Sequence, residues 1–486
     1  MGIVAKQSLN NLMSTYLGFG IGALNVLFLY PKFLTVEYYG LVTFLLSAGN
    51  LFWPFMALGV HNTIVKFYTS YTATPDKDKL LNFALILPLL LGLLLALLGT
   101  VFYDVLLKYF EGENDLVQPF IWGIFVIAIA TAYFEVFFAW AKVQYKSVFG
   151  TVMRELFHRI AITILLICLY VEFISVHLFI NLLIGVFILR AVAMLGYAIT
   201  LYRPKFSLQL PSRLKELLNY SFLIFIAGTV AVALFDLDKV MIEYFMPIEN
   251  VSIYGIAIYI ATVIAVPSKA MHQITNPITA KYLNYNETGA LEDLYVRSSN
   301  TLFLISGYVF VLILTNVNML YEIIPEDYRV GVSIVVLISL VKLSDNILGN
   351  NNSIIFNSKY YKTVLAAGLV LVGVAFVLNM WLIPIYGIYG AAYATFFSFL
   401  VYNLFKLIFV RITFGIHPFN RKSLNIFLLI VLLTFGFYYW NFSTGSPFVN
   451  IILKSIIISI IYAIVSYKAN LSKDVKELYK KISLKK

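Results

Sequence analysis

The sequence predicts an all-α integral membrane protein with fourteen transmembrane helices, and three observations support this. Hydrophobic residues make up 61% of the 486 residues and charged residues only 12%, which leaves too little polar surface for a soluble protein of this length. Apolar runs of about 20 residues recur along the chain, and this length spans a bilayer as a helix. The alternating segments typical of a transmembrane β-barrel do not occur, so a helical bundle is expected.

Apolar runs bounded by charges, proline and glycine define the expected spans. They cover residues 10–31, 39–60, 80–103, 116–139, 152–171, 177–200, 217–238, 251–271, 299–321, 328–349, 363–383, 387–410, 424–440 and 447–467. A cleavable signal is not expected, because the first run is long enough to stay in the bilayer. The single cysteine, Cys168, lies within one of these runs, which excludes a disulfide framework.

Lysine and arginine are unevenly distributed between the two sets of loops. If the N-terminus is cytoplasmic, nearly all of them lie in cytoplasmic loops or helix ends, and the exceptions are Lys32, Lys108, Lys239 and Arg329. This is the positive-inside bias of helical membrane proteins. Both termini are therefore expected in the cytoplasm. The net charge of +11 reflects this topology and does not indicate a nucleic-acid partner.

Short loops and missing motifs argue against catalysis. The longest loop has about thirty residues, which leaves no room for a soluble catalytic domain. The chain has neither a P-loop pattern nor histidines at a metal-binding spacing. We therefore expect no enzyme activity, no cofactor and no metal. The basic tail is expected to rest on anionic membrane lipids.

The segment Glu37–Tyr68 has a counterpart 215 positions later, where Tyr39-Gly40 falls on Tyr254-Gly255. Under the same shift, Ile64–Tyr68 falls on Thr279–Leu283. A shift of six helices preserves orientation, so two lobes related by an axis along the membrane normal are expected. Chance identity in an aromatic-rich sequence is the alternative. The expected parts are an N-lobe (1–205), a C-lobe (206–415), two further helices (416–468) and a basic cytoplasmic tail (469–486).

Pro54 and Pro267 fall within two positions of each other under the same shift. Proline inside a spanning helix removes a backbone hydrogen bond and kinks the helix. Both prolines are therefore candidates for gating kinks, and an ordinary packing kink is the alternative for each.

Charges within the spans are costly, at about 2.5–3.5 kcal/mol at a helix centre, so each needs an explanation. Arg190, in the sixth span, is the cation farthest from either surface. Two interpretations are open: Arg190 takes part in binding, or its long side chain extends to the cytoplasmic interface. Asp236 and Lys239 are three residues apart and can form an ion pair or take part in ion coupling. Lys342 and Asp345 repeat this spacing, and internal pairing is expected.

Basic residues also gather at the cytoplasmic ends of the repeated helices: His61, Lys66, Lys269, His272 and Lys281. If these helices face each other, the residues form a basic inner mouth that can hold a diphosphate. The positive-inside rule alone would also place lysines there.

A specific motif follows the eleventh span: Pro384-Ile385-Tyr386-Gly387-Ile388-Tyr389-Gly390-Ala391-Ala392-Tyr393-Ala394-Thr395. It resembles the Pro-x-Tyr-Gly-x-x-Gly-Ala-Ala-x-Ala-Thr segment of bacterial polysaccharide transporters. These are lipid-linked oligosaccharide flippases of the multidrug/oligosaccharidyl-lipid/polysaccharide exporter superfamily. The stretches Tyr39-Gly40 to Leu58-Gly59 and Asp238-Lys239 to Pro277 are similar to further parts of that family. The small residues of the motif allow close helix packing.

The resemblance implies two pseudo-symmetric six-helix lobes around a central cavity in the bacterial plasma (inner) membrane. It implies alternating access that moves an undecaprenyl-diphosphate-linked oligosaccharide to the outer leaflet for O-antigen, capsule or exopolysaccharide synthesis. Other polysaccharide-assembly proteins are possible partners. The cavity helices would carry His61, Lys66, Asp236, Lys239, Lys269 and Lys281, with Asn25 of the first span.

Three other functions stay open at this point. A cation-coupled multidrug exporter of the same superfamily would need a buried acidic residue, for which Asp236 and Glu135 are candidates. A glycan polymerase or ligase would carry a large catalytic outer loop, which this chain lacks. A purely structural role would leave the duplicated halves unexplained.

Overall fold

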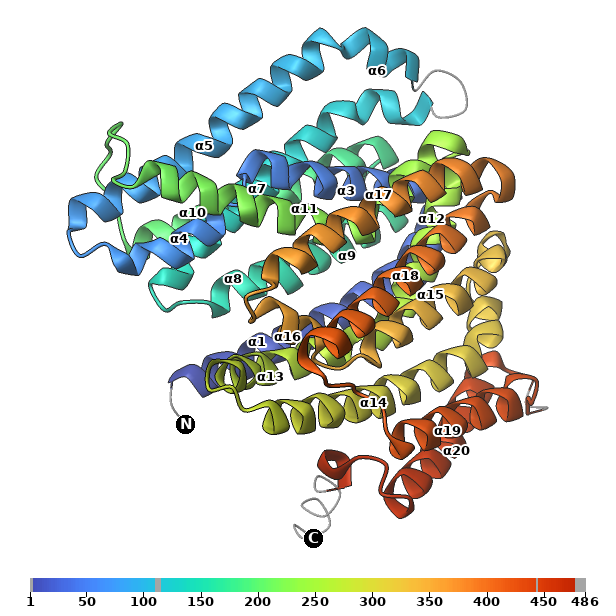
Figure 1. Cartoon of the computed structure of the whole chain (residues 1–486). Coiled ribbons are helices and arrows are strands. Elements are labelled where there is room, and N and C mark those ends of the chain that lie inside the picture. The colour runs from blue at the N-terminus through green and yellow to red at the C-terminus, as the bar shows by residue number, and fades with distance from the viewer. Residues whose placement is uncertain (1–2, 110–114, 443–444, 477–486) are drawn as a thin grey trace. The chain divides into compact units, whose positions relative to one another are not determined.

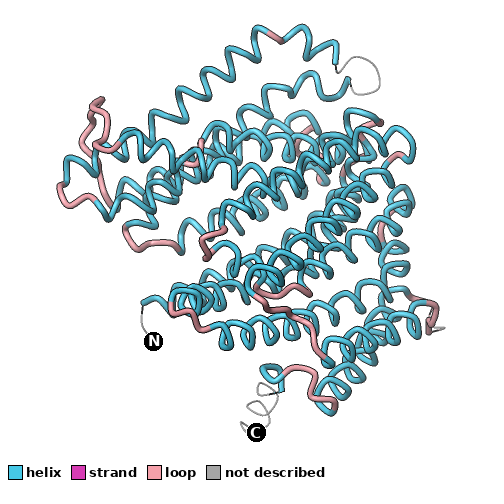
Figure 2. The backbone as a smooth tube through the Cα atoms, viewed as in Figure 1, coloured by secondary structure: helices cyan, strands magenta, loops and turns pink. Residues whose placement is uncertain are grey.

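The computed structural model describes residues 3–109, 115–442 and 445–476, and within these ranges it contains helices and loops but no strand (Figure 2). Most of the basic tail lies outside the described residues. The chain forms two compact units, Met1–Ser252 and Ile253–Lys486.

The first unit holds the following elements in chain order: α1 (Ile3–Leu24), η1 (Asn25–Leu29), α2 (Tyr30–Phe33), α3 (Val36–Ala57), α4 (Val60–Phe67), η2 (Tyr68–Ser70), α5 (Thr74–Val101), α6 (Tyr103–Tyr109), η3 (Asp115–Phe120), α7 (Ile121–Val143), α8 (Val148–Val152), η4 (Met153–Phe157), α9 (His158–Tyr170), α10 (Val176–Leu201), α11 (Leu214–Phe245) and the start of α12 (Glu249–Thr262). Helix α7 is the centre of this unit, because α3, α4 and α10 all pack on it. Its face is rich in buried aromatic side chains, among them Phe134, Phe138 and Trp140.

The second unit continues with η5 (Val263–Ala265), α13 (Val266–Asn284), α14 (Thr288–Ile323), η6 (Glu326–Gly331), α15 (Val332–Asn346), α16 (Asn351–Phe356), α17 (Tyr361–Tyr386), α18 (Ile388–Phe414), α19 (Arg421–Tyr438) and α20 (Pro447–Lys468). Helices α19 and α20 lie side by side against α14 (Figure 1). An apolar core that includes Phe303, Ile430 and Ile458 joins these three helices.

Among the described residues, 11 helices are long and apolar enough to cross a membrane, and bent α11 makes twelve if it counts as one span. The other two predicted spans, 152–171 and 328–349, contain shorter helices. The first is divided among α8, η4 and α9, and the second among η6 and α15. The count of fourteen therefore stays a prediction, whereas the all-helical, multi-pass character is confirmed.

The division into lobes at residue 205 also stays a prediction. Helix α11, expected as the first helix of the second lobe, packs on α3 within the first unit. Thr63 of α4 and Ser221 of α11 add a buried hydrogen bond of 2.6 Å between their hydroxyl groups.

Each of the two prolines predicted as kinks lies beside a helix break. Pro54 precedes the end of α3, and Leu58 and Gly59 follow with positive φ angles of 43° and 75° before α4 begins. Pro267 lies in the first turn of α13, directly after the 3-10 turn Val263–Ala265. Whether these breaks move during function stays a prediction.

The Pro384–Thr395 motif forms the tight turn between α17 and α18. Gly387 has a φ of 60° and a ψ of −140°, a conformation that favours glycine. A Cβ atom on Gly390 would collide with the backbone carbonyl of Leu382. The glycines are therefore needed to close the turn, in addition to the helix packing that the sequence indicated.

Candidate functional site

A group of charged side chains lies inside the first unit, and we call it the arginine cluster. It consists of four cations and two carboxylates on α7, η4, α9 and α10, namely Lys142, Arg154, Arg159, Arg190, Glu135 and Glu155. With all six side chains charged, the cluster has a net charge of +2, from four positive and two negative groups.

Arg190 of α10 is the most deeply buried member, with 5% of its surface exposed. Its guanidinium lies over the rings of Phe134 and Phe187, with centroids 4.5 and 4.8 Å away. One nitrogen donates a 3.3 Å hydrogen bond to the Thr131 hydroxyl. Cation–π contacts and this hydrogen bond replace part of the hydration that a buried guanidinium loses.

Arg154 is the most accessible arginine of the cluster, with 42% of its side chain exposed. Its guanidinium lies 3.8 Å from Glu135 and 3.4 Å from Glu155. Glu155 also lies 3.9 Å from Arg159, one helical turn further along. These distances are too long for tight bidentate pairs, so the guanidinium groups keep hydrogen-bonding capacity for another anion.

Two π-helical segments position this part of the cluster. Segment η4 (Met153–Phe157) carries Arg154 and Glu155, and η1 (Asn25–Leu29) lies in the first span. Asn25 is buried, donates to the carbonyl of Arg159 at 3.0 Å and accepts from Thr163 at 2.7 Å. A π-helical turn widens the local backbone and often marks a functional site. Asn25, predicted as a cavity residue, thus holds the helix that carries Arg159.

His61 and Lys66 of α4 also lie in the first unit. His61 is partly buried against the ring of Trp53, 5.5 Å away, and is close enough to Glu135 to interact with its charge. Lys66 is exposed, and its ammonium lies 3.9 Å from the centroid of the Tyr220 ring. The structure therefore brings His61 toward the arginine cluster and leaves Lys66 near the surface.

Asp236 and Lys239 form the ion pair that their spacing indicates, with a separation of 2.7 Å. Asn50 of α3 donates a further 3.4 Å hydrogen bond to the other carboxylate oxygen. Asp236 is thus neutralised within its own helix and tied to α3. Its role in ion coupling stays a prediction.

In the second unit, α13 carries Lys269, His272 and Lys281. Both lysines are exposed, whereas His272 is partly buried and interacts with the charges of Asp345 and Lys406. Asp345 accepts a 2.8 Å hydrogen bond from Lys406 of α18, which the sequence did not indicate. Lys342, the partner that the spacing suggested, adds a favourable charge to Asp345.

A buried polar network surrounds the break between α15 and α16. Asn350 accepts from the Ser298 hydroxyl at 3.0 Å and donates to Thr279 at 2.8 Å. Asn346 donates to the Ile264 carbonyl at 2.8 Å and to Ser306 at 2.7 Å. These bonds fasten α13, α14 and the α15–α16 break to one another.

Two members of the arginine cluster, Arg154 and Arg159, were interpreted from the sequence only as helix-end cations of the positive-inside pattern. Their spacing of five residues and their distance from Arg190 in the chain give no signal of a shared site. The one available signal was the buried position of Arg190 itself.

The model of the family described as "Polysaccharide biosynthesis protein" matches residues 4–282. This is more than half of the 486 residues. The chain belongs to the polysaccharide biosynthesis protein family. The match confirms the resemblance that the motifs indicated. Among proteins with curated functions, none matches this sequence.

Solved structures show the same fold. The structure described as "Lipid II flippase MurJ, inward closed conformation" is similar to this family member, with 17% identity, a TM-score of 0.75 and coverage of 94% of this chain and 99% of that chain. An inward-facing MATE multidrug transporter of the MOP superfamily has 15% identity, a TM-score of 0.58 and coverage of 84% and 94%. An outward-facing one has 12% identity, a TM-score of 0.52 and coverage of 84% and 96%. The fold is therefore that of membrane transporters.

Proposed function

We propose that this protein is a flippase that moves an undecaprenyl-diphosphate-linked oligosaccharide from the cytoplasmic to the outer leaflet for surface polysaccharide synthesis. The observation that carries the proposal is the arginine cluster, whose net charge of +2 inside the first unit suits a diphosphate. Membership of the polysaccharide biosynthesis protein family and the flippase-like fold support the same function.

The diphosphate would be bound by guanidinium groups, whose planar donors match phosphate oxygens in pairs. Arg154 is the first contact, because its side chain is the most exposed arginine of the cluster. Arg190 acts at longer range from its buried position, since its charge is held there by Phe134 and Phe187. Alternating access would then carry the head group and sugar across, while the polyprenyl chain stays in the lipid.

Flipping of a radiolabelled lipid-linked oligosaccharide in proteoliposomes tests this function. Protein-containing vesicles should flip the lipid faster than protein-free vesicles, and equal rates would contradict the proposal. Arg154→Ala should lower apparent affinity roughly tenfold to hundredfold, because a charge-assisted hydrogen bond contributes about 1.5–3 kcal/mol. Arg329→Ala is the matched control, because it removes an arginine paired with Glu326 outside the cluster.

The lysines of α4 and α13 need a separate test. The basic inner mouth predicted from Lys66 and Lys281 requires that both contribute to capture. The Lys66→Ala and Lys281→Ala double variant should then lower export more than either single variant in a complementation assay. Unchanged export would remove both lysines from the site and leave the arginine cluster as the binding group.

A cation-coupled multidrug exporter is the second candidate function. The observation in its favour is the buried Asp236, held by Lys239 and Asn50 in the first unit. Expression in a drug-sensitive strain distinguishes the two functions. Resistance that is lost in Asp236→Asn and kept in Arg154→Ala would favour the exporter over the flippase.

A further inference from the structure

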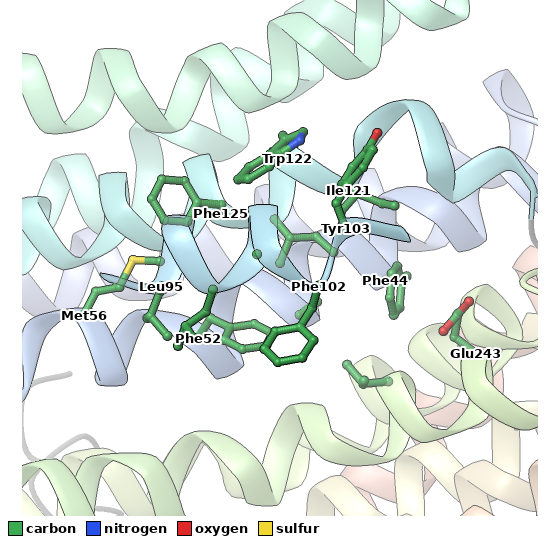
Figure 3. A pocket seen from close by; sticks show the side chains of 15 residues that line it. Phe44, Phe52, Met56, Leu95, Phe102, Tyr103, Ile121, Trp122, Phe125 and Glu243 are labelled. Carbon is green, nitrogen blue, oxygen red and sulfur yellow. The ribbon is translucent and has the colours of Figure 1, made fainter. Parts of the chain in front are cut away.

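Two pockets of the described residues differ in character. The first unit has a pocket lined mainly by apolar side chains of α3, α5 and α7, among them Phe52, Phe102 and Trp122 (Figure 3). Its carboxylate, Glu243, is buried and already takes part in an interaction. The second unit has a pocket between α14, the start of α19 and the segment Leu471–Asp474, which we call the tail pocket. Polar and charged side chains line most of it, so it can recognise a charged ligand.

The tail pocket has a volume of about 120 Å³, which is room for several water molecules or one phosphate group. On α14 its lining residues follow each other at spacings of three and one from Asp293 to Thr301, so they share one face of the helix. Lys422 lines the pocket from the first turn of α19, and Lys473 from the segment after α20. Three chain segments thus meet at one polar cavity.

Hydrogen bonds hold the walls of the tail pocket in place. The hydroxyl groups of Thr301 and Ser472 share a 2.9 Å hydrogen bond. Asn300 donates to the side-chain oxygen of Asn420 at 3.3 Å. Leu471, beside Ser472, is 1% exposed and belongs to the apolar core that joins α14, α19 and α20. The segment after α20 therefore has a defined position against α14.

Both carboxylates among the described lining residues lie close to the same arginine. Asp474 accepts a hydrogen bond from the Arg297 guanidinium and a second one, of 3.2 Å, from the Thr301 hydroxyl. Asp293 lies 3.7 Å from the same guanidinium. These two negative charges therefore compensate Arg297 at the α14 side of the pocket.

The lysines of the tail pocket have no such partner. Lys422 and Lys473 form no ion pair within the described part of the chain. The charges that act on Lys422 are those of Lys473 and Lys476, and both repel it. The first turn of α19 contains no acidic residue. Lys422 thus lacks a counter-charge, which an anion between it and Lys473 would supply.

The tail pocket lies at a membrane surface. Helix α19 begins at Arg421 and α20 ends at Lys468, and both helices are long and apolar enough to cross a membrane. Their ends at the pocket therefore mark the head-group region. Leu424 of α19 and Ile464 of α20 are 59% and 49% exposed, so acyl chains lie beside the pocket. A membrane lipid is the nearest source of a phosphate group at this depth.

We propose that the tail pocket binds the phosphate of an anionic membrane phospholipid between Lys422 and Lys473. Lysine binds phosphate as a point charge. Anionic lipids are abundant in the cytoplasmic leaflet, which is where the predicted orientation puts the pocket. The bound lipid would hold the segment after α20 against α14 and α19. The site is separate from the arginine cluster, and the proposal does not depend on the flippase function.

Native mass spectrometry of the full chain measures lipid binding directly. The protein is titrated in detergent with phosphatidylglycerol, or with phosphatidylcholine that carries the same acyl chains. Phosphatidylglycerol should form the first lipid adduct with a dissociation constant about tenfold lower, because each lysine contributes about fivefold to the binding of an anionic lipid.

The double variant Lys422→Gln with Lys473→Gln should abolish this difference between the two lipids. The matched control is Lys359→Gln with Lys362→Gln, because these exposed lysines lie at the start of α17, on the same predicted side of the membrane and outside the pocket. The control should keep the full preference. If the pocket variant does not fold, Lys473→Gln alone, at an exposed side chain, should reduce the preference to about twofold.

Equal affinity of the unchanged chain for the two lipids would overturn the proposal. A preference that survives in the pocket variant would do the same, as would an equal loss in the control, since that result indicates diffuse attraction to basic residues. Inorganic phosphate at the same concentration should not displace phosphatidylglycerol. Displacement would identify a free phosphate as the ligand and overturn the lipid assignment. Transport is not measured in any of these experiments, so their outcome is independent of the flippase proposal.

Discussion

At the scale of single residues, Lys406 is one of the most deeply buried charges in the second unit. It is 1% exposed, donates to Asp345 at 2.8 Å and lies 4.5 Å from the ring of Tyr402. A buried ammonium without its counter-charge is strongly unfavourable. The ion pair therefore allows the charged Lys406 to be buried where α18 packs against α15.

Asp345→Asn should lower the free energy of unfolding by about 1–3 kcal/mol, because it leaves the charge of buried Lys406 uncompensated, while Asp345 itself is 39% exposed and partly screened by solvent. Thermal unfolding in detergent, followed by tryptophan fluorescence, measures the change. The double variant Asp345→Leu with Lys406→Met should recover most of the loss, since it removes both charges. Asp293→Asn is the control, because Asp293 forms an exposed pair with Arg297 that contributes at most about 1 kcal/mol. An equal loss in Asp293→Asn would contradict this account.

At the scale of elements, the arginine cluster depends on close packing between α1 and η4. A Cβ atom on Gly18 of α1 would meet the backbone carbonyl of Glu155 and the guanidinium of Arg159. No neighbouring atom lies within 4 Å of the corresponding position at Gly20. Gly18 therefore permits the close approach of α1 to η4, whereas Gly20 borders open space.

Gly18→Ala should destabilise the protein by about 1–3 kcal/mol, since the Glu155 backbone must shift to accommodate the methyl group. It should also lower lipid flipping, because Arg154 and Arg159 lie on the displaced segment. Gly20→Ala should be neutral or stabilise by up to about 1 kcal/mol, because alanine favours helix at an open position. Thermal unfolding and the proteoliposome assay compare the two variants. Equal effects of Gly18→Ala and Gly20→Ala would show that the close α1–η4 contact does not determine stability or flipping.

At the scale of the whole molecule, the predicted orientation assigns each loop to one side of the membrane. Thr72 lies between η2 and α5 and is expected in the cytoplasm. Phe173 lies between α9 and α10, is 80% exposed and is expected outside. Both residues lie in short loops at the protein surface. A reagent confined to one side of the membrane therefore shows on which side each loop lies.

Cysteine labelling in intact cells tests this orientation. In a Cys168→Ala background, Phe173→Cys should react with a membrane-impermeant maleimide. Thr72→Cys should react only after the cells are permeabilised. Labelling of Thr72→Cys in intact cells would contradict the predicted topology.

Local features of this protein follow from the sequence because helix geometry is local. The membrane spans are readable from apolar runs, and Asp236 pairs with Lys239 because residues three apart share a helix face. The tight turn at Gly387 and Gly390 likewise lies within one short motif. None of these requires knowledge of how distant helices pack.

The charge clusters, by contrast, were decided by tertiary structure. Asp345 accepts a hydrogen bond from Lys406, 61 positions away, in addition to the charge of the nearby Lys342 that the spacing suggested. Arg154 and Arg159 join Arg190 because α10 packs on α7 and also contacts α9 and η4. Apolar content and helical period determine that a segment is a membrane helix, but the contact face and rotation of each helix depend on packing with its neighbours. That packing, which no local pattern encodes, determines which charges share a site.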